Sequence, residues 1–177
     1  IEQYVWTKAI EERKARVLAE AGFDMGLDGA DSFSVQYQNA NNSVRVSDEF
    51  MQAVVDDADW DLTAVTTGEA LRTVKARRLW REIAEAAWEC ADPGLQFDTT
   101  INRWHTAPNH GRITASNPCS EYFHVENSAC NLASINLLKY LQDDGGFDVG
   151  AFTHTVDTVF TAQEIVVDYA SYPTKAI

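Results

Sequence analysis

Residues 113–130 contain the side chains of this chain that are best suited to chemistry. The segment reads ITASNPCSEYFHVENSAC and places Asn117, Cys119 and Glu121 at alternate positions. Pro118 disfavours a helical conformation at the residue before it, so Asn117 is expected to be extended. Because side chains alternate along an extended segment, the amide, the thiol and the carboxylate are predicted to lie on one side of it.

The three groups differ in what each could contribute to a reaction. The amide donates and accepts hydrogen bonds, the sulfur reacts as a nucleophile or by one-electron chemistry, and the carboxylate can serve as a general base. A nearby carboxylate disfavours ionisation of the thiol, because like charges repel. A protonated thiol does not suit a cysteine-protease nucleophile, which reacts as the thiolate, but it suits hydrogen-atom transfer.

Plainer roles for the cysteines remain open at this point. Spacing alone favours burial of Cys119 and Cys130 as small apolar side chains, and Cys90, on the apolar face of a predicted helix, has the same ordinary role. A reversible redox pair of Cys119 and Cys130 is a further alternative. The chain has no C-x-x-C pair and its four histidines are scattered, so the pattern matches neither a zinc site nor a thioredoxin-type motif.

Length and charge argue against several classes of protein. The chain has 177 residues, enough for one domain with an apolar core, and its net charge of −13 argues against a nucleic-acid surface. No apolar run approaches the roughly 18 residues that a membrane span needs, and no signal peptide is recognisable. Three cysteines without dense spacing do not resemble a secreted disulfide framework, so a cytoplasmic location is expected.

Helical and strand patterns alternate along the chain, which is typical of the α/β class with a parallel sheet. Apolar spacing and end signals predict helices over residues 2–22, 48–57 after a capping Ser47, 70–90 and 150–170. Strands are predicted within residues 34–47, 60–65 and 95–97. The other segments are a polar stretch at 98–112, a strand or helix start at 131–141 and a turn at 142–148.

Two motifs around the cysteines resemble a known family. SNPCSE at residues 116–121, followed by CNLASINL at residues 130–137, is similar to the finger-loop region of the large, catalytic subunit of ribonucleotide reductase. NANNSVRVSDEFMQAV at residues 39–54 and ADPGLQFDTTIN at residues 91–102 resemble segments that precede this loop in the family. DPGLQFDTTIN is most similar to the class II branch, which depends on adenosylcobalamin. The resemblance spans essentially the whole chain.

The resemblance implies a fold for the chain. The family forms a ten-stranded α/β barrel of two half-barrels, and a central finger loop carries the radical cysteine. On this basis residues 1–112 would end the first half-barrel, residues 113–130 would be the finger loop, and residues 131–177 would begin the second half-barrel. The chain starts at Ile1 within a helical pattern and ends without a closing element, so we expect a central fragment that is inactive by itself.

The resemblance also implies roles for individual residues. Cys119 would hold the thiyl radical that removes the 3′ hydrogen of a ribonucleotide, and Glu121 would be the base on the 3′ hydroxyl. Asn117 would hydrogen-bond the ribose hydroxyls, and Ser116 would join Asn117 and Glu121 in binding substrate. Cys130 would be one member of the dithiol pair that supplies reducing equivalents. Many family members have glycine where this chain has Ser120.

Cofactor and partners follow from the same resemblance. The family implies adenosylcobalamin as radical source, ribonucleoside diphosphates as substrates, a thioredoxin-like or dithiol reductant, and a possible homodimer. The second redox cysteine and the binding segments for deoxynucleotide and ATP effectors would precede residue 1, and the phosphate-binding segment would follow residue 177. A class I reductase with a separate metal-containing radical subunit is the alternative within the family. A thiol redox module or a structural module without chemistry is the alternative outside it.

Overall fold

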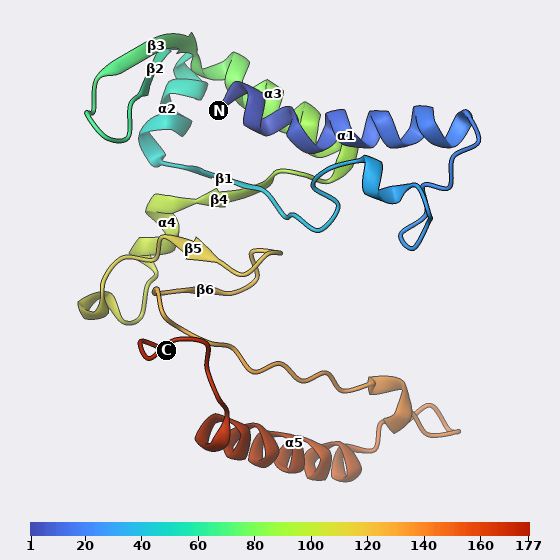
Figure 1. The fold of residues 1–177 in the computed structure, drawn as a ribbon. Coiled ribbons are helices and arrows are strands. Elements are labelled where there is room, and N and C mark those ends of the chain that lie inside the picture. Colours follow the sequence, from blue (N-terminus) through green and yellow to red (C-terminus); the bar gives the residue numbers. More distant parts are fainter. The chain divides into compact units, whose positions relative to one another are not determined.

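The computed structural model describes residues 1–177, which form two compact units. Unit 1 comprises Ile1–Glu126 and unit 2 comprises Asn127–Ile177. Helices alternate with short strands, which confirms the predicted α/β class, but the strands form three separate two-stranded sheets and no closed barrel (Figure 1). None of the helices has both the length and the apolar character needed to cross a membrane.

The regular elements of each unit have the following bounds. The α-helices of unit 1 are α1 (Glu2–Glu20), α2 (Asp48–Asp56), α3 (Ala76–Cys90) and α4 (Asp98–Arg103). Its strands are β1 (Ser43–Val46), β2 (Asp59–Thr63), β3 (Ala70–Lys75), β4 (Gly94–Phe97), β5 (Ala115–Ser116) and β6 (Phe123–His124). Short 3₁₀ turns lie at Ser32–Ser34 and Pro108–His110. Unit 2 contains a 3₁₀ turn at Leu137–Tyr140 and the long helix α5 (Val149–Tyr169).

The core of unit 1 combines apolar residues of the helices α1, α2 and α3 with residues of the strands β1 and β3. Strands β1 and β4 pair in parallel, with Val44 opposite Leu95, whereas the other two strand pairs are antiparallel. The predicted parallel sheet is therefore confirmed for this pair alone. Ser47 caps helix α2, as predicted, because its hydroxyl accepts a hydrogen bond from the N–H of Phe50 at 3.2 Å. Phe50 then packs edge-on against Trp60, with ring centroids 5.2 Å apart. The buried apolar cluster consists of Val5, Val44, Val46, Phe50, Val54, Val74, Ala76, Leu79 and Ile83.

One helix prediction for unit 1 is wrong in part. The helix predicted over residues 70–90 begins only at Ala76, because residues 70–75 form β3 and pair antiparallel with β2. The buried Val74, opposite Trp60, draws this stretch into a hairpin that residues 64–69 close. Residues 98–112, which the sequence identified only as a polar stretch, open with the six-residue helix α4. Such a short helix is marginal by itself, so contacts with the rest of unit 1 must hold it.

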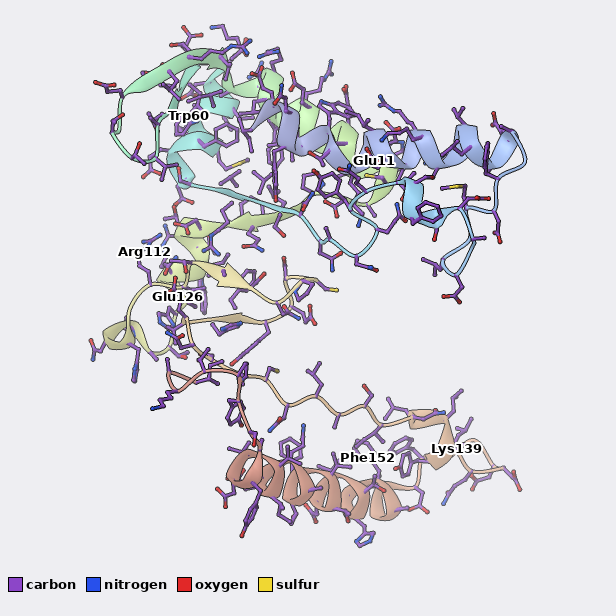
Figure 2. The ribbon with its side chains drawn as sticks, in the orientation of Figure 1. Glu11, Trp60, Arg112, Glu126, Lys139 and Phe152 are labelled. Atoms are coloured by element: carbon purple, nitrogen blue, oxygen red, sulfur yellow. The ribbon has the colours of Figure 1, made fainter.

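Unit 2 is built around α5 and an aromatic cluster. Phe152 lies on α5 (Figure 2), and its ring is 5.4 Å from both Tyr140 and Phe147. The expected turn before α5 is confirmed, because the N–H of Gln142 donates to Gly146 at 2.8 Å. Residues 131–136 form neither strand nor α-helix. Several large apolar side chains of α5 are exposed, namely Val149, Phe160, Ile165, Val166, Val167 and Tyr169.

Candidate active site

A closed loop at the tip of the β5–β6 hairpin carries Cys119. The backbone N–H of Asn117 donates to the carbonyl oxygen of Tyr122 at 3.1 Å, and the N–H of Tyr122 donates to Oδ1 of Asn117 at 2.9 Å. Within this ring the N–H of Ser120 donates to the carbonyl oxygen of Asn117 at 3.1 Å. Pro118 and Cys119 therefore occupy the two central positions of a turn, the first of which proline favours.

The predicted alternation of side chains along an extended segment is wrong. Residues 117–122, hereafter the Cys119 loop, turn back on themselves instead of continuing β5. Ser120 has a φ of 63°, which lies in the left-handed region and cannot belong to a strand. Glycine adopts this conformation without steric cost, which gives a physical reason for glycine at this position in the family that the sequence resembles.

Asn117, Cys119 and Glu121 lie in one loop, but their side chains make no hydrogen bonds with one another. Oδ1 of Asn117 is used inside the loop, whereas its Nδ2 group makes no hydrogen bond and remains able to donate. The Cys119 thiol is free and exposed. The Glu121 carboxylate is also exposed and has no ion-pair or hydrogen-bond partner in the structure. All three residues thus have polar groups available to a ligand.

Ser116 supports the Cys119 loop from the end of β5. Its hydroxyl donates to the carbonyl oxygen of Asn117 at 2.7 Å and accepts from Nε2 of Gln96 at 2.8 Å. The hydroxyl proton is therefore committed within the protein. If Ser116 also contacts a substrate, its side chain must act as a hydrogen-bond acceptor.

The other two cysteines differ in exposure. Cys130 belongs to unit 2, where its thiol is exposed and lies 3.8 Å from the carbonyl oxygen of Asn131. An exposed thiol is open to exchange with other thiols and disulfides. Cys90 is half-buried at the end of α3 and lies 3.3 Å from the carbonyl oxygen of Asp92. Burial raises the pKa of the Cys90 thiol, which agrees with a packing role.

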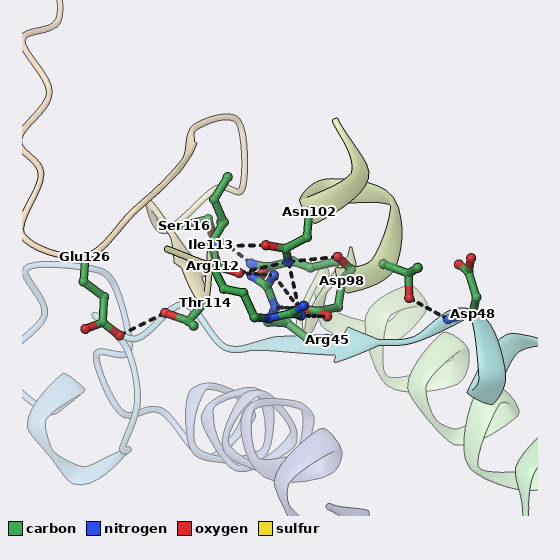
Figure 3. A network of polar contacts seen from close by, with 11 residues as sticks. Arg45, Asp48, Asp98, Asn102, Arg112, Ile113, Thr114, Ser116 and Glu126 are labelled. Atoms are coloured by element: carbon green, nitrogen blue, oxygen red, sulfur yellow. Dashed lines mark hydrogen bonds and ion pairs between the residues drawn. The ribbon is translucent and has the colours of Figure 1, made fainter. Parts of the chain in front are cut away.

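A charged network ties the base of the hairpin to β1 and α4. Arg45 of β1 donates to Oδ1 of Asp98 through Nε at 3.0 Å and through Nη2 at 2.7 Å. Arg112 forms a second ion pair with the other carboxylate oxygen of Asp98 (Figure 3). Nη2 of Arg45 also donates to the carbonyl oxygen of Ile113 at 3.0 Å. The network therefore fixes the segment that enters β5.

Asn102 of α4 holds the same segment. Its Oδ1 accepts from the N–H of Ile113 at 3.0 Å, and its Nδ2 donates to the carbonyl oxygen of Ile113 at 3.2 Å (Figure 3). One side-chain amide thus satisfies both backbone groups of a residue that is only 4% exposed. After β6, Glu126 accepts from the Thr114 hydroxyl at 3.0 Å. These contacts explain why the polar stretch after β4 forms the short helix α4.

Two arginines set the protonation state of Asp98. Burial alone would raise the pKa of this carboxyl group, but hydrogen bonds and charges from Arg45 and Arg112 outweigh it and lower the pKa below its ordinary value. The ion pairs therefore stabilise the fold fully above the ordinary carboxyl pKa of about 4. This stabilisation is lost as the pH falls through the lower, folded-state pKa.

We expect Asp98→Asn to lower the free energy of unfolding at pH 7 by about 2 kcal/mol, the scale of hydrogen bonds to charged groups. Its stability should also fall less steeply than that of the wild type below pH about 4, because the titrating group is gone. Chemical denaturation at a series of pH values measures both effects, with Asp28→Asn in an exposed loop as control. Parallel pH profiles for Asp98→Asn and wild type would contradict the role of Asp98.

Sequence reasoning missed two supports of the Cys119 loop, namely Arg45 and Gln96. The available signal was a polar residue at the centre of a short apolar pattern, in VRV for Arg45 and in LQF for Gln96. The two residues lie opposite each other in the β1–β4 register. Neither pattern reveals that the β5–β6 hairpin brings the hydroxyl groups of Ser116 and Ser120 within hydrogen-bond distance of Gln96.

A cavity of 530 Å³ lies in unit 1 beside the charged network. Apolar residues from β1, α2, β2 and α3 form most of its wall, and Arg45, Asp98 and Arg112 supply charged groups. Neither Cys119 nor Glu121 lines this cavity. The cavity and the Cys119 loop are therefore separate features of unit 1.

Known proteins resemble the chain over its whole length. The family model described as the ribonucleotide reductase barrel domain matches residues 1–177. A vitamin B12-dependent ribonucleotide reductase of Streptomyces coelicolor is 55% identical over 181 aligned residues, which cover 100% of this chain and 19% of that protein. A protein of the same name from Rhodopirellula baltica is 48% identical, over 99% of this chain and 17% of its own length.

A more distant relative carries a more specific name. The vitamin B12-dependent ribonucleoside-diphosphate reductase of Thermoplasma acidophilum is 37% identical over 83% of this chain and 19% of its own length. The chain thus spans about a fifth of the length of these curated relatives. The matches confirm the resemblance carried by the motifs at residues 116–121 and 130–137. The chain belongs to the ribonucleotide reductase family, and the family model that it matches is that of the barrel domain.

Proposed function

We propose that the chain is a central segment of the catalytic subunit of an adenosylcobalamin-dependent ribonucleotide reductase, which makes 2′-deoxyribonucleotides for DNA synthesis. The observation that carries the proposal is the free, exposed Cys119 thiol in a loop closed on Asn117. The same loop presents the Glu121 carboxylate and Nδ2 of Asn117 without partners. The names of the Streptomyces and Thermoplasma relatives support both the reaction and the cofactor.

Each reactive group has one role in the reduction. A thiyl radical on Cys119 removes the hydrogen atom from C3′ of the ribose and forms an S–H bond, while Glu121 accepts the proton of the 3′ hydroxyl. A dithiol pair that includes Cys130 supplies two electrons and two protons and becomes a disulfide. One of these protons lets the 2′ hydroxyl leave as water, and the other ends in the new C2′–H bond. Glu121 returns its proton to the 3′ oxygen and the hydrogen on Cys119 returns to C3′, which restores the radical.

Three polar groups would orient the ribose against Cys119. Nδ2 of Asn117 is free to donate to a ribose hydroxyl oxygen, and Glu121 is free to accept. Ser116 would contribute as an acceptor, because its own proton is committed to the Asn117 carbonyl oxygen. Holding a substrate in a reactive geometry can lower a barrier by several kcal/mol, about 7 to 11 in well-oriented model reactions. The loop is therefore proposed as the positioning element of the site.

The exposure of Cys119 fits a cofactor that must approach the sulfur from outside the loop. The thiol makes no hydrogen bond that would have to break first. Adenosylcobalamin, when bound, supplies the radical, and the residues of this chain hold the sulfur and the groups that face the ribose.

The complete enzyme would contain much that lies outside this chain. We propose that residues 1–112, 113–130 and 131–177 contribute to the first half-barrel, the finger loop and the second half-barrel of a ten-stranded barrel. Ribonucleoside diphosphates, a thioredoxin-like protein or small dithiol, nucleotide effectors and a second copy of the subunit would be its partners in the cytoplasm. Similarity to the relatives supports the nucleotide substrate and the reductant among these partners.

The proposal is tested with the full-length reductase, meaning a polypeptide of the relatives' length that contains this chain. It is mixed with a ribonucleoside diphosphate, a dithiol and adenosylcobalamin, without a second subunit, and deoxyribonucleotide is measured by chromatography. We expect product that depends on the cobalamin. Product only after addition of a metal-containing radical subunit would move the protein to class I. No product in either case would overturn the reductase proposal.

A further inference from the structure

Gln96 joins the Cys119 loop to the charged network of unit 1. Gln96 lies in β4 and is 4% exposed. Its Oε1 accepts from Nη1 of Arg45 at 3.0 Å. Its Nε2 donates to the Ser116 hydroxyl at 2.8 Å and to the Ser120 hydroxyl at 2.9 Å. The two serines flank Cys119 in the sequence, so one buried amide holds both sides of the loop.

The hydrogen bonds through Gln96 run in one direction only. A guanidinium group can donate but never accept, so Arg45 must meet the amide oxygen of Gln96. The amide nitrogen then necessarily faces the serines and donates to both. Ser116 in turn donates to the carbonyl oxygen of Asn117 at 2.7 Å, the same oxygen that closes the turn. The chain of donors thus runs from Arg45 through Gln96 and Ser116 to Asn117.

The Cys119 loop needs such support from outside itself. Strands β5 and β6 have two residues each, and hairpins of this size are marginal without further packing. Ser120 is held at a φ of 63°, in the left-handed region that is strained for a residue other than glycine. The buried amide supplies contacts on both sides of Cys119 that offset these costs.

We propose that Gln96 is a positioning residue that holds the Cys119 loop in its reactive geometry, acting through Ser116 and Ser120. The role in turnover rests on the proposed reductase function, whereas the hold on the loop does not depend on it. Positions near a reacting atom are sensitive, because a displacement of about 1 Å can lower a rate about a hundredfold. Loss of the hydrogen bonds from Gln96 therefore lowers turnover even when the fold is retained.

The test uses Gln96→Met in the full-length reductase, because methionine has a similar volume and shape but cannot replace these hydrogen bonds. Gln52→Met on the exposed face of α2 is the matched control. We expect kcat to fall about tenfold to a hundredfold in Gln96→Met and to stay at the wild-type value in the control. Amide hydrogen exchange should become faster at residues 117, 120 and 122 and remain unchanged in α5.

A second variant, Ser120→Ala, breaks the same link at its loop end without altering β4. It should accelerate exchange in the Cys119 loop in the same direction. Wild-type exchange of the loop in both variants would overturn the hold by Gln96. Faster exchange with wild-type kcat per folded enzyme would reduce Gln96 to a structural residue and overturn the positioning role. Amide hydrogen exchange still reports on the Cys119 loop if the wild type proves inactive as a reductase. Failure of the reductase proposal can therefore be distinguished from failure of the proposed role of Gln96.

Discussion

Replacing Cys119 by alanine in the full-length reductase is expected to reduce deoxyribonucleotide formation to the background of the assay. The proposed mechanism passes through a radical on this sulfur, and no other thiol in the Cys119 loop could take its place. The side chain is exposed and makes no hydrogen bond, so its removal should leave the fold unchanged. Product formation measures turnover, circular dichroism measures whether the fold is retained, and equilibrium binding of a ribonucleoside diphosphate measures the affinity for substrate.

Cys90→Ala is the matched control for the loss of a thiol. Cys90 is half-buried at the end of α3 and outside the Cys119 loop, so this variant should retain turnover. Its stability should fall slightly, because a packed side chain is shortened. Wild-type turnover by Cys119→Ala would remove the radical role of this cysteine and leave a redox-sensing role as the alternative. Disulfide formation between Cys119 and Cys130 on mild oxidation would then favour the redox sensor.

Glu121→Gln is expected to lower turnover about 10²- to 10⁴-fold, the usual contribution of a general base. The amide keeps the size of the side chain but cannot take the proton of the 3′ hydroxyl. Substrate binding should change little, because glutamine can still hydrogen-bond a hydroxyl group. Steady-state kcat and the equilibrium dissociation constant of the substrate, measured in parallel, separate the two effects.

Glu126→Gln provides the control on the same hairpin. Glu126 accepts from Thr114 at 3.0 Å, outside the Cys119 loop, and its substitution should leave kcat within a few-fold of wild type. An equal loss in both variants would point to a general weakening of the hairpin. Undiminished turnover in Glu121→Gln would assign the base to another residue.

The long helices could be predicted from sequence because each follows a local rule. Apolar spacing and end signals indicated α1 and α5, and the Ser47 cap indicated the start of α2. The boundary at Ala76 could not be predicted in this way, because the pairing of Val74 with Trp60 decides it. Helix α4 depends on contacts of Asp98 and Asn102 with Arg45 and Ile113, which a local pattern does not contain.

The candidate site could be predicted in its residue types but not in its geometry. The motif SNPCSE indicated Asn117, Cys119 and Glu121 through its resemblance to the family. Their arrangement depends on the left-handed Ser120 and on a hairpin with only two-residue strands, which leaves little signal in sequence. The support from Gln96 requires β1 and β4 to pair in parallel, and the contact with Arg45 joins residues 51 positions apart.

Electron paramagnetic resonance on the full-length reductase tests the central claim most directly. The enzyme is frozen shortly after mixing with a ribonucleotide and adenosylcobalamin, with ordinary cysteine or with cysteine deuterated at its β carbon. An unpaired electron on Cys119 couples to the β hydrogens, so we predict a signal that deuteration narrows and that Cys119→Ala lacks. A signal that is unaffected by deuteration, or that persists in Cys119→Ala, would contradict a radical on Cys119.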